Sequence, residues 1–257
     1  TMGAAISYSD NVYAVKTHLF LGENTLVNMS HRLGIESKLS PNPSLALGTG
    51  EMSMSELIEA YSTFASMGNR VEQHFIEKIE DNSGNTIYQF NHYNEKILSE
   101  SLTFILNEML TYTYDKAFIN YNYPTVISLL PKISNKYAIK TGTTDTDVWI
   151  VGYNKNAVLS IWNGYDNNKK IDTGEHNYHK NIWIDTMENY LKDKDNNWYD
   201  IPNDVVGTLV NPITGETAKE GDKNTKIFYF LKGTEPSYGT KDFETVFKEE
   251  NEKKFAS

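Results

Sequence analysis

Apolar residues recur at helical spacing in several segments of the chain. Residues 24–33 have this pattern and stop at Gly34. A stronger helix is predicted after the capping box that begins at Ser53, with Gly68 as its stop. Further helices are predicted from Ser99 to about Tyr112 and from about 178 to 192. The apolar positions of these last three helices are Leu57, Tyr61, Phe64 and Ala65; Leu102, Ile105, Leu106, Met109 and Leu110; and Trp183, Met187, Tyr190 and Leu191.

Short β-type runs lie between these helical patterns. Residues 71–79 and 86–89 flank a turn-rich cluster and predict a β-hairpin. Residues 137–141, 147–154 and 156–163 are consecutive and joined by tight connections, so they are expected to pair as antiparallel neighbours. Strands in succession with helices before and after them predict an α/β (α+β) fold in which an antiparallel sheet is sandwiched between helical layers.

Composition narrows the functional classes. A chain of 257 residues can bury one large core, or one domain plus an appendage. The net charge of −10 argues against a nucleic-acid partner. The absence of cysteine excludes a disulfide framework, thiol catalysis and cysteine-based zinc sites. No apolar run reaches membrane-spanning length, and the first residues do not have the pattern of a signal peptide.

The segment from Lys140 to Thr144, Lys-Thr-Gly-Thr-Thr, is the strongest candidate for a binding site. A lysine ammonium attracts a carboxylate, a threonine hydroxyl can hydrogen-bond to it, and Gly142 has no side chain to block a close approach. The residues alone also permit a plainer interpretation. Lys140 could be a solvated strand residue paired with Asp145 or Asp147, with the threonines as ordinary strand formers.

A second candidate, Ser9-Asp10-Asn11, leads directly into an apolar-periodic segment, residues 12–20. By itself this tripeptide could simply cap the start of a helix. Two other Ser-x-Asn sequences begin at Ser40 and Ser83. Ser40 lies among prolines and Ser83 lies among turn-forming residues, so we interpret both sequences as parts of turns.

Lys-Thr-Gly and Ser-Asp-Asn are signature motifs of penicillin-binding proteins and class A β-lactamases, together with Ser-x-x-Lys. The chain resembles the transpeptidase domain of class A penicillin-binding proteins over most of its length and in the order of that family's motifs. The other segments that carry this resemblance are Ser44 to Glu51, Glu56 with Ala60 and Tyr61, Asp147 to Tyr153, Asn211 to Gly215, and Lys232 to Pro236.

The resemblance implies a peptidoglycan D,D-transpeptidase that cross-links D-Ala-D-Ala stem peptides through an acyl-serine intermediate and is inhibited by β-lactams. It implies catalytic roles for Ser9, Asn11 and Lys140. It implies that the substrate is bound by Thr141, Gly142, Thr143 and Thr144. No metal or organic cofactor is expected. The partners expected are stem peptides and β-lactam antibiotics, and no nucleic acid.

One family motif is missing, because no serine in the chain has a lysine three positions later. The resemblance therefore implies a truncated transpeptidase domain at 1–202 without its N-terminal part, and an appended C-terminal segment at 203–257. The nucleophile, a glycosyltransferase domain and a membrane anchor are expected upstream, which would place the protein on the extracytoplasmic face of a bacterial membrane. The chain alone is expected to be inactive. The alternatives are a serine β-lactamase or β-lactam sensor, and a non-catalytic module that binds cell-wall peptides.

Three other features have plain interpretations. His176 and His179 could suggest a metal pair, but a surface helix start is the preferred interpretation. Trp149, Trp162 and Trp183 are interpreted as core aromatics, and the charged run at 248–254 as a solvated tail.

Overall fold

The computed structural model describes residues 1–92, 95–218 and 221–236. Its centre is a three-stranded sheet made of β3 (Ala138–Thr143), β4 (Asp147–Tyr153) and β5 (Val158–Gly164). The strands are antiparallel, in the order β3-β4-β5, with Lys140 opposite Val151 and Val151 opposite Ser160. The predicted antiparallel neighbours are therefore confirmed.

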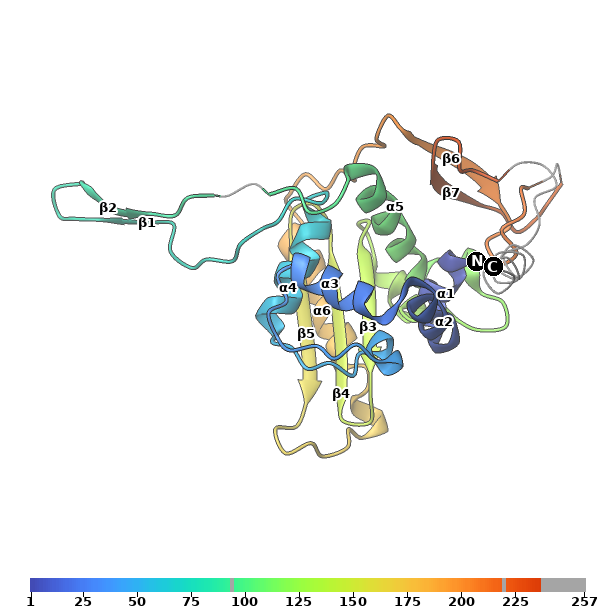
Figure 1. Ribbon diagram of the computed structural model, residues 1–257, viewed down its shortest axis with the longest axis horizontal. Coiled ribbons are helices and arrows are strands. Elements are labelled where there is room, and N and C mark those ends of the chain that lie inside the picture. Colours follow the sequence, from blue (N-terminus) through green and yellow to red (C-terminus); the bar gives the residue numbers. More distant parts are fainter. Residues whose placement is uncertain (93–94, 219–220, 237–257) are drawn as a thin grey trace.

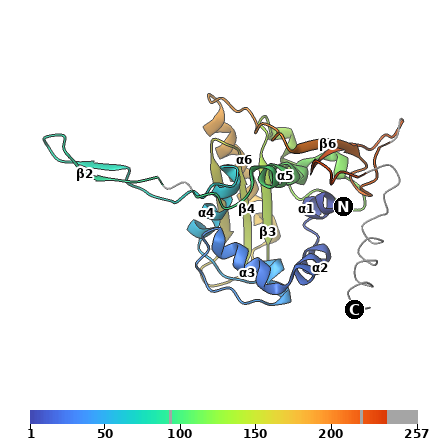
Figure 2. The ribbon, with the colours of Figure 1, turned by 45° about the horizontal axis from the view of Figure 1, so that its top comes forward.

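Helices cover both faces of this sheet (Figures 1 and 2). Helix α6 (Tyr178–Leu191) packs against the face that includes Ile139 and Ile150. Helices α4 (Met54–Ala65) and α5 (Glu100–Thr111) pack against the opposite face, which includes Ala138 and Tyr153. Successive residues of a strand point to opposite faces, so alternate apolar positions serve two cores. This is the predicted sandwich of an antiparallel sheet between helical layers.

Close packing between α6 and the sheet depends on Gly152. A Cβ atom at this position would lie 2.4 Å from Cζ2 of Trp183, far inside van der Waals contact. Trp183 is fully buried, and its indole N–H donates to the Leu159 carbonyl at 2.9 Å. This hydrogen bond holds the ring in place, so the absence of a side chain at Gly152 allows α6 to lie close against the sheet.

Three helices at the start of the chain lie beside the sheet: α1 (Met2–Tyr8), α2 (Asn11–Leu21) and α3 (Glu23–Arg32). The sequence pattern predicts the second and third but not α1. Short 3₁₀ segments connect the larger elements: Pro43–Leu47, Tyr112–Tyr114, Lys116–Phe118, Ile127–Lys132 and Thr173–Glu175. No helix in the described part of the chain is long and apolar enough to cross a membrane.

The predicted hairpin exists, but its strands are shorter than expected. It consists of β1 (Lys78–Glu80) and β2 (Thr86–Gln89), while residues 71–77 form no strand. Both strands are exposed along their whole length. The hairpin projects away from the rest of the molecule (Figure 1).

A second strand pair lies at the other end of the molecule. Strands β6 (Val205–Val210) and β7 (Lys226–Leu231) are antiparallel, and Val210 and Phe228 pack with Tyr8 and Tyr112 of the main body. Asn211 to Gly215 forms the turn that follows β6, with Gly215 at a φ of 80°. The charged run at 248–254 lies outside the described residues.

Several residues predicted for the core are exposed. Leu102 is 53% exposed and Tyr190 is 52% exposed, because each lies on the outer side of its helix. Trp183 is buried as predicted, but Trp149 and Trp162 are only half-buried. These two tryptophans are cross-strand partners on β4 and β5, with ring centroids 6.3 Å apart.

We predict that Gly152→Ala destabilises the fold by about 1–3 kcal/mol, because the new methyl group must displace Trp183 or the strand. Gly142→Ala is the matched control in the adjoining strand, because its Cβ would meet only Cβ of Trp149 at 3.6 Å, an ordinary contact. Urea denaturation of the two variants measures the difference. Equal free energies of unfolding would contradict the proposed role of Gly152.

Candidate active site

Lys140 and Ser9 meet although 131 residues separate them in the chain. Nζ of Lys140 donates to Oγ of Ser9 at 2.7 Å and to the carbonyl oxygen of Thr141 at 2.7 Å. Lys140 lies on β3, on the same face as Ala138, and this face is the one covered by α4 and α5. Two motifs that the sequence could only place separately therefore meet in a single site.

The turn between α1 and α2 positions Ser9. Ser9 follows the last residue of α1 and has a left-handed backbone, with φ 57° and ψ 50°. This conformation costs a residue other than glycine about 1–2 kcal/mol. Asp10 begins the next helix, where its carboxylate accepts the Tyr13 amide at 2.9 Å. The helix-cap interpretation is thus correct for Asp10, while the hydroxyl of Ser9 is directed to Lys140.

The Lys140 ammonium is partly removed from solvent. Burial lowers its pKa to about 8 from the usual value of lysine, so it is still mainly a cation at neutral pH. In the described part of the chain no carboxylate forms an ion pair with it. The two candidate partners bond elsewhere: Asp145 to Lys170 at 2.6 Å, and Asp147 to Nε1 of Trp162 at 2.9 Å. The interpretation of Lys140 as a solvated, ion-paired strand residue is therefore wrong.

The end of β3 after Lys140, from Thr141 to Thr143, is an open segment of an outer strand, which we call the ledge. Thr141 is half-buried, and Gly142 and Thr143 are exposed. Neither the backbone nor the packing of the protein requires glycine at 142, because its φ is not in the left-handed region and a Cβ would fit. A methyl group there would stand on the exposed ledge itself. The absence of a side chain at Gly142 leaves room for a ligand to approach the strand.

Thr144 differs from its neighbours. Its hydroxyl accepts from the Asp147 amide at 2.9 Å, and its own amide donates to the Asp147 carbonyl at 2.8 Å. These bonds close the tight turn between β3 and β4. In this geometry Thr144 supports the end of the ledge from within the turn.

Asn11 lies in the first turn of α2 with its side chain exposed. Trp149 is opposite Gly142 in the sheet register, and Trp162 is opposite Trp149. The two half-buried rings therefore form an apolar surface beside the ledge. The sequence pattern predicted both rings for the core and not for this surface. The available signal was the register itself, which places Trp149 on the same face as Gly142 and Lys140.

The two histidines considered as metal ligands do not form a site. His179 is 1% exposed in α6, so it is not a surface residue as the sequence suggested. Burial lowers the pKa of its imidazole to about 4, which keeps the ring neutral. His176 bonds instead to the Ile171 carbonyl, at 3.3 Å.

Comparison with known proteins identifies the family of the chain. Residues 1–188 match the family model of the penicillin-binding protein transpeptidase domain. The chain is 37% identical over 238 residues to penicillin-binding protein 2D of Bacillus subtilis, covering 92% of this chain and 34% of the relative. It is 30% identical over 252 residues to penicillin-binding protein 1A of Aquifex aeolicus, covering 96% and 33%. The chain thus spans about a third of the length of these relatives.

Solved structures show the same fold. The crystal structure of penicillin-binding protein 1A from Haemophilus influenzae superposes with a TM-score of 0.82 at 23% identity, covering 93% of this chain and 41% of that one. PonA1 from Mycobacterium tuberculosis in complex with penicillin V gives a TM-score of 0.63 at 19% identity, covering 78% and 58%. The family match over most of the chain confirms the resemblance, and the chain belongs to the penicillin-binding protein transpeptidase family.

Proposed function

We propose that this chain is part of a peptidoglycan D,D-transpeptidase that cross-links stem peptides ending in D-Ala-D-Ala. The observation that carries the proposal is the 2.7 Å contact between Nζ of Lys140 and Oγ of Ser9. It joins the Lys140 ammonium, which pairs with no carboxylate among the described residues, to a hydroxyl group beside an open strand. Such an arrangement suits acyl transfer, in which an anionic substrate must be held while a proton moves.

The ledge is proposed to bind the substrate. The terminal carboxylate of the peptide would accept hydrogen bonds from the hydroxyl groups of Thr141 and Thr143 and be attracted by Lys140. In a chain with a net charge of −10, this ammonium provides a local positive potential for an anion. β-Lactams carry a carboxylate beside their ring amide and would occupy the same ledge; the structural relative PonA1 has been solved in complex with penicillin V.

The other residues serve the reaction. The nucleophilic serine gives its proton to its lysine partner as its oxygen attacks the carbonyl carbon of the penultimate D-alanine. The C–N bond then breaks, and Ser9 passes that proton on to the leaving nitrogen, so that D-alanine departs as a free amine. The Asn11 amide holds the acyl chain. The backbone N–H of Thr143 is one of two donors to the oxyanion, and losing such a donor costs on the order of 3 kcal/mol of barrier. A second stem-peptide amine then attacks the ester, forms the cross-link and frees the serine.

The nucleophilic serine and its lysine partner are proposed to lie outside this sequence, since none of its serines has a lysine three positions later. On this proposal residues 1–202 are the later part of the transpeptidase domain, and 203–257 are an appended segment. The complete protein is proposed to include a glycosyltransferase domain and an anchor, with the site on the extracytoplasmic side of the membrane.

The first test concerns the nucleophile. The 257-residue chain incubated with a fluorescent penicillin should remain unlabelled, while a protein extended upstream should form a stable covalent adduct. Heat-denatured extended protein serves as the control for nonspecific labelling. An adduct mapped to any serine of the 257-residue chain would refute the proposal that the nucleophile lies elsewhere.

The second test separates binding from proton transfer in the extended protein. Thr141→Val keeps a strand-compatible shape but removes the hydroxyl group, so acylation efficiency should fall roughly tenfold to a hundredfold. Ser9→Ala should lower the acylation rate constant by a factor on the order of 10² to 10⁴ with little change in initial binding. Stopped-flow fluorescence separates the two effects.

Thr208→Val is the matched control for this test, because Thr208 is also a half-buried strand threonine but lies on β6, away from the ledge. It should acylate at the normal rate. If Ser9→Ala acylated normally but bound penicillin weakly, the roles assigned to Ser9 and Thr141 would be reversed.

A further inference from the structure

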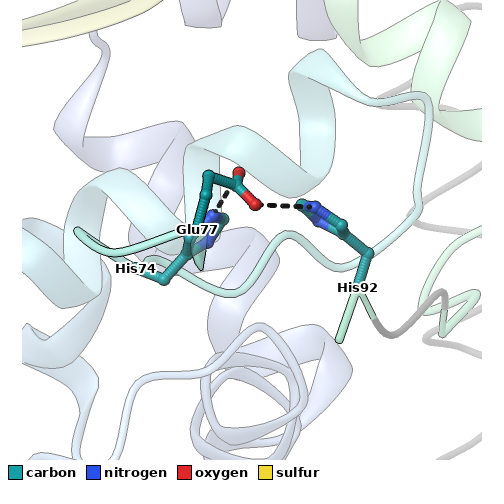
Figure 3. Close-up of side chains that lie close together, drawn as sticks. All are labelled: His74, Glu77 and His92. Carbon is teal, nitrogen blue, oxygen red and sulfur yellow. Dashed lines mark hydrogen bonds and ion pairs between the residues drawn. The ribbon is translucent and has the colours of Figure 1, made fainter. Parts of the chain in front are cut away.

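Three potential metal ligands meet near the projecting hairpin, far from the ledge. Nε2 of His74 lies 2.6 Å from Oε1 of Glu77, and Nε2 of His92 lies 3.3 Å from Oε2 of the same carboxylate. Figure 3 shows the Glu77 carboxylate between the two imidazole rings. All three ligand atoms lie within 4.8 Å of one another, and in the described part of the chain no other cluster of this kind occurs.

The three side chains come from both arms of the hairpin. His74 and Glu77 precede β1, and His92 follows β2. The Phe90 amide donates to the Glu77 carbonyl at 2.8 Å, which closes the base of the hairpin at this level. Any ion held by all three ligands would therefore connect the two arms beside this last backbone bond.

The rings are held in suitable orientations. Nδ1 of His74 lies 3.3 Å from the Glu72 carbonyl; an N–H on Nδ1 would leave the lone pair on Nε2, the atom beside Glu77. The same ring stacks on Phe90 with centroids 3.7 Å apart and planes 9° from parallel. The His92 ring meets the edge of Phe90 at 5.1 Å. One aromatic side chain thus fixes both imidazoles around the carboxylate.

We propose that His74, Glu77 and His92 bind one divalent transition-metal ion, with Zn²⁺ as the expected occupant. Two imidazoles and one carboxylate are ligands that zinc accepts, and three protein ligands leave a fourth position for water. Imidazole nitrogens favour zinc over Mg²⁺ or Ca²⁺, which prefer oxygen ligands. This site is independent of the transpeptidase chemistry, and its role is to fasten the base of the exposed hairpin.

The alternative is an ion-pair network without a metal. His74 is 22% exposed and Glu77 60% exposed in their side chains, and exposed ion pairs contribute little to stability. The two interpretations make different predictions: a metal site gives saturable binding of one ion for each chain, and this binding depends on all three residues together.

The test is calorimetric titration of Zn²⁺ into the untagged 257-residue chain and its variants. We expect one ion for each chain. Loss of an outer-shell partner alone weakens metal sites by about 10- to 100-fold, so His74→Ala, His92→Ala and Glu77→Gln should each weaken binding at least tenfold. Glu80→Gln and His31→Ala are matched controls that should bind normally, since Glu80 pairs with Lys78 and His31 bonds to Ile35 elsewhere. Circular dichroism checks that every variant is folded.

Absence of saturable binding in the wild-type chain would overturn the site in favour of the ion-pair network. Equal binding in all variants would overturn it by assigning the ion to other residues. Hydrogen exchange provides the second readout: Zn²⁺ should slow exchange of the Phe90 amide in the wild-type chain but not in His92→Ala. Binding without this protection would overturn the proposal that the ion connects the two arms.

Discussion

The close contact between Trp183 and Gly152 fixes how α6 lies on the sheet that carries Lys140. It holds α6 flat against one face of the sheet, with a Cβ at Gly152 excluded by the 2.4 Å distance to the ring. With that face filled, the other face receives α4 and α5, and α1 packs beside α5. Lys140 points to this second face, where its ammonium group meets the hydroxyl of Ser9 in the turn between α1 and α2.

Two features of the site lower the stability of the fold, and a turn with only a structural role would need neither of them. Ser9 has a left-handed backbone, and Lys140 is desolvated enough to lower its pKa to about 8. Both features lower stability, and each directs a polar group toward the other. The exposed ledge and the bare Gly142 add no stability to the fold. Features that reduce stability and converge at one point are typical of functional sites, and here they converge where two motifs meet.

Local patterns predicted the elements that are strongly periodic or capped. The capping box at Ser53 and the three central strands were correct, since their signals lie within a few residues. Helix α1 was missed because seven residues carry too little periodicity. Burial was predicted less well. Tyr190 and Leu102 fit the apolar stripes but are exposed, because the neighbours available to cover a stripe depend on tertiary packing. His74, Glu77 and His92 converge only through the hairpin, so spacing could not identify them.

We infer that Ser9 and Lys140 act as one unit in acylation, and a double-mutant cycle measures how strongly they are coupled. Acylation by penicillin would be measured in the upstream-extended protein carrying Ser9→Ala, Lys140→Ala or both substitutions. Residues that act as a unit are strongly non-additive, so the double variant should be slower than the slower single variant by no more than about threefold. A double variant whose loss of rate equals the product of the two single losses would show that Ser9 and Lys140 act independently.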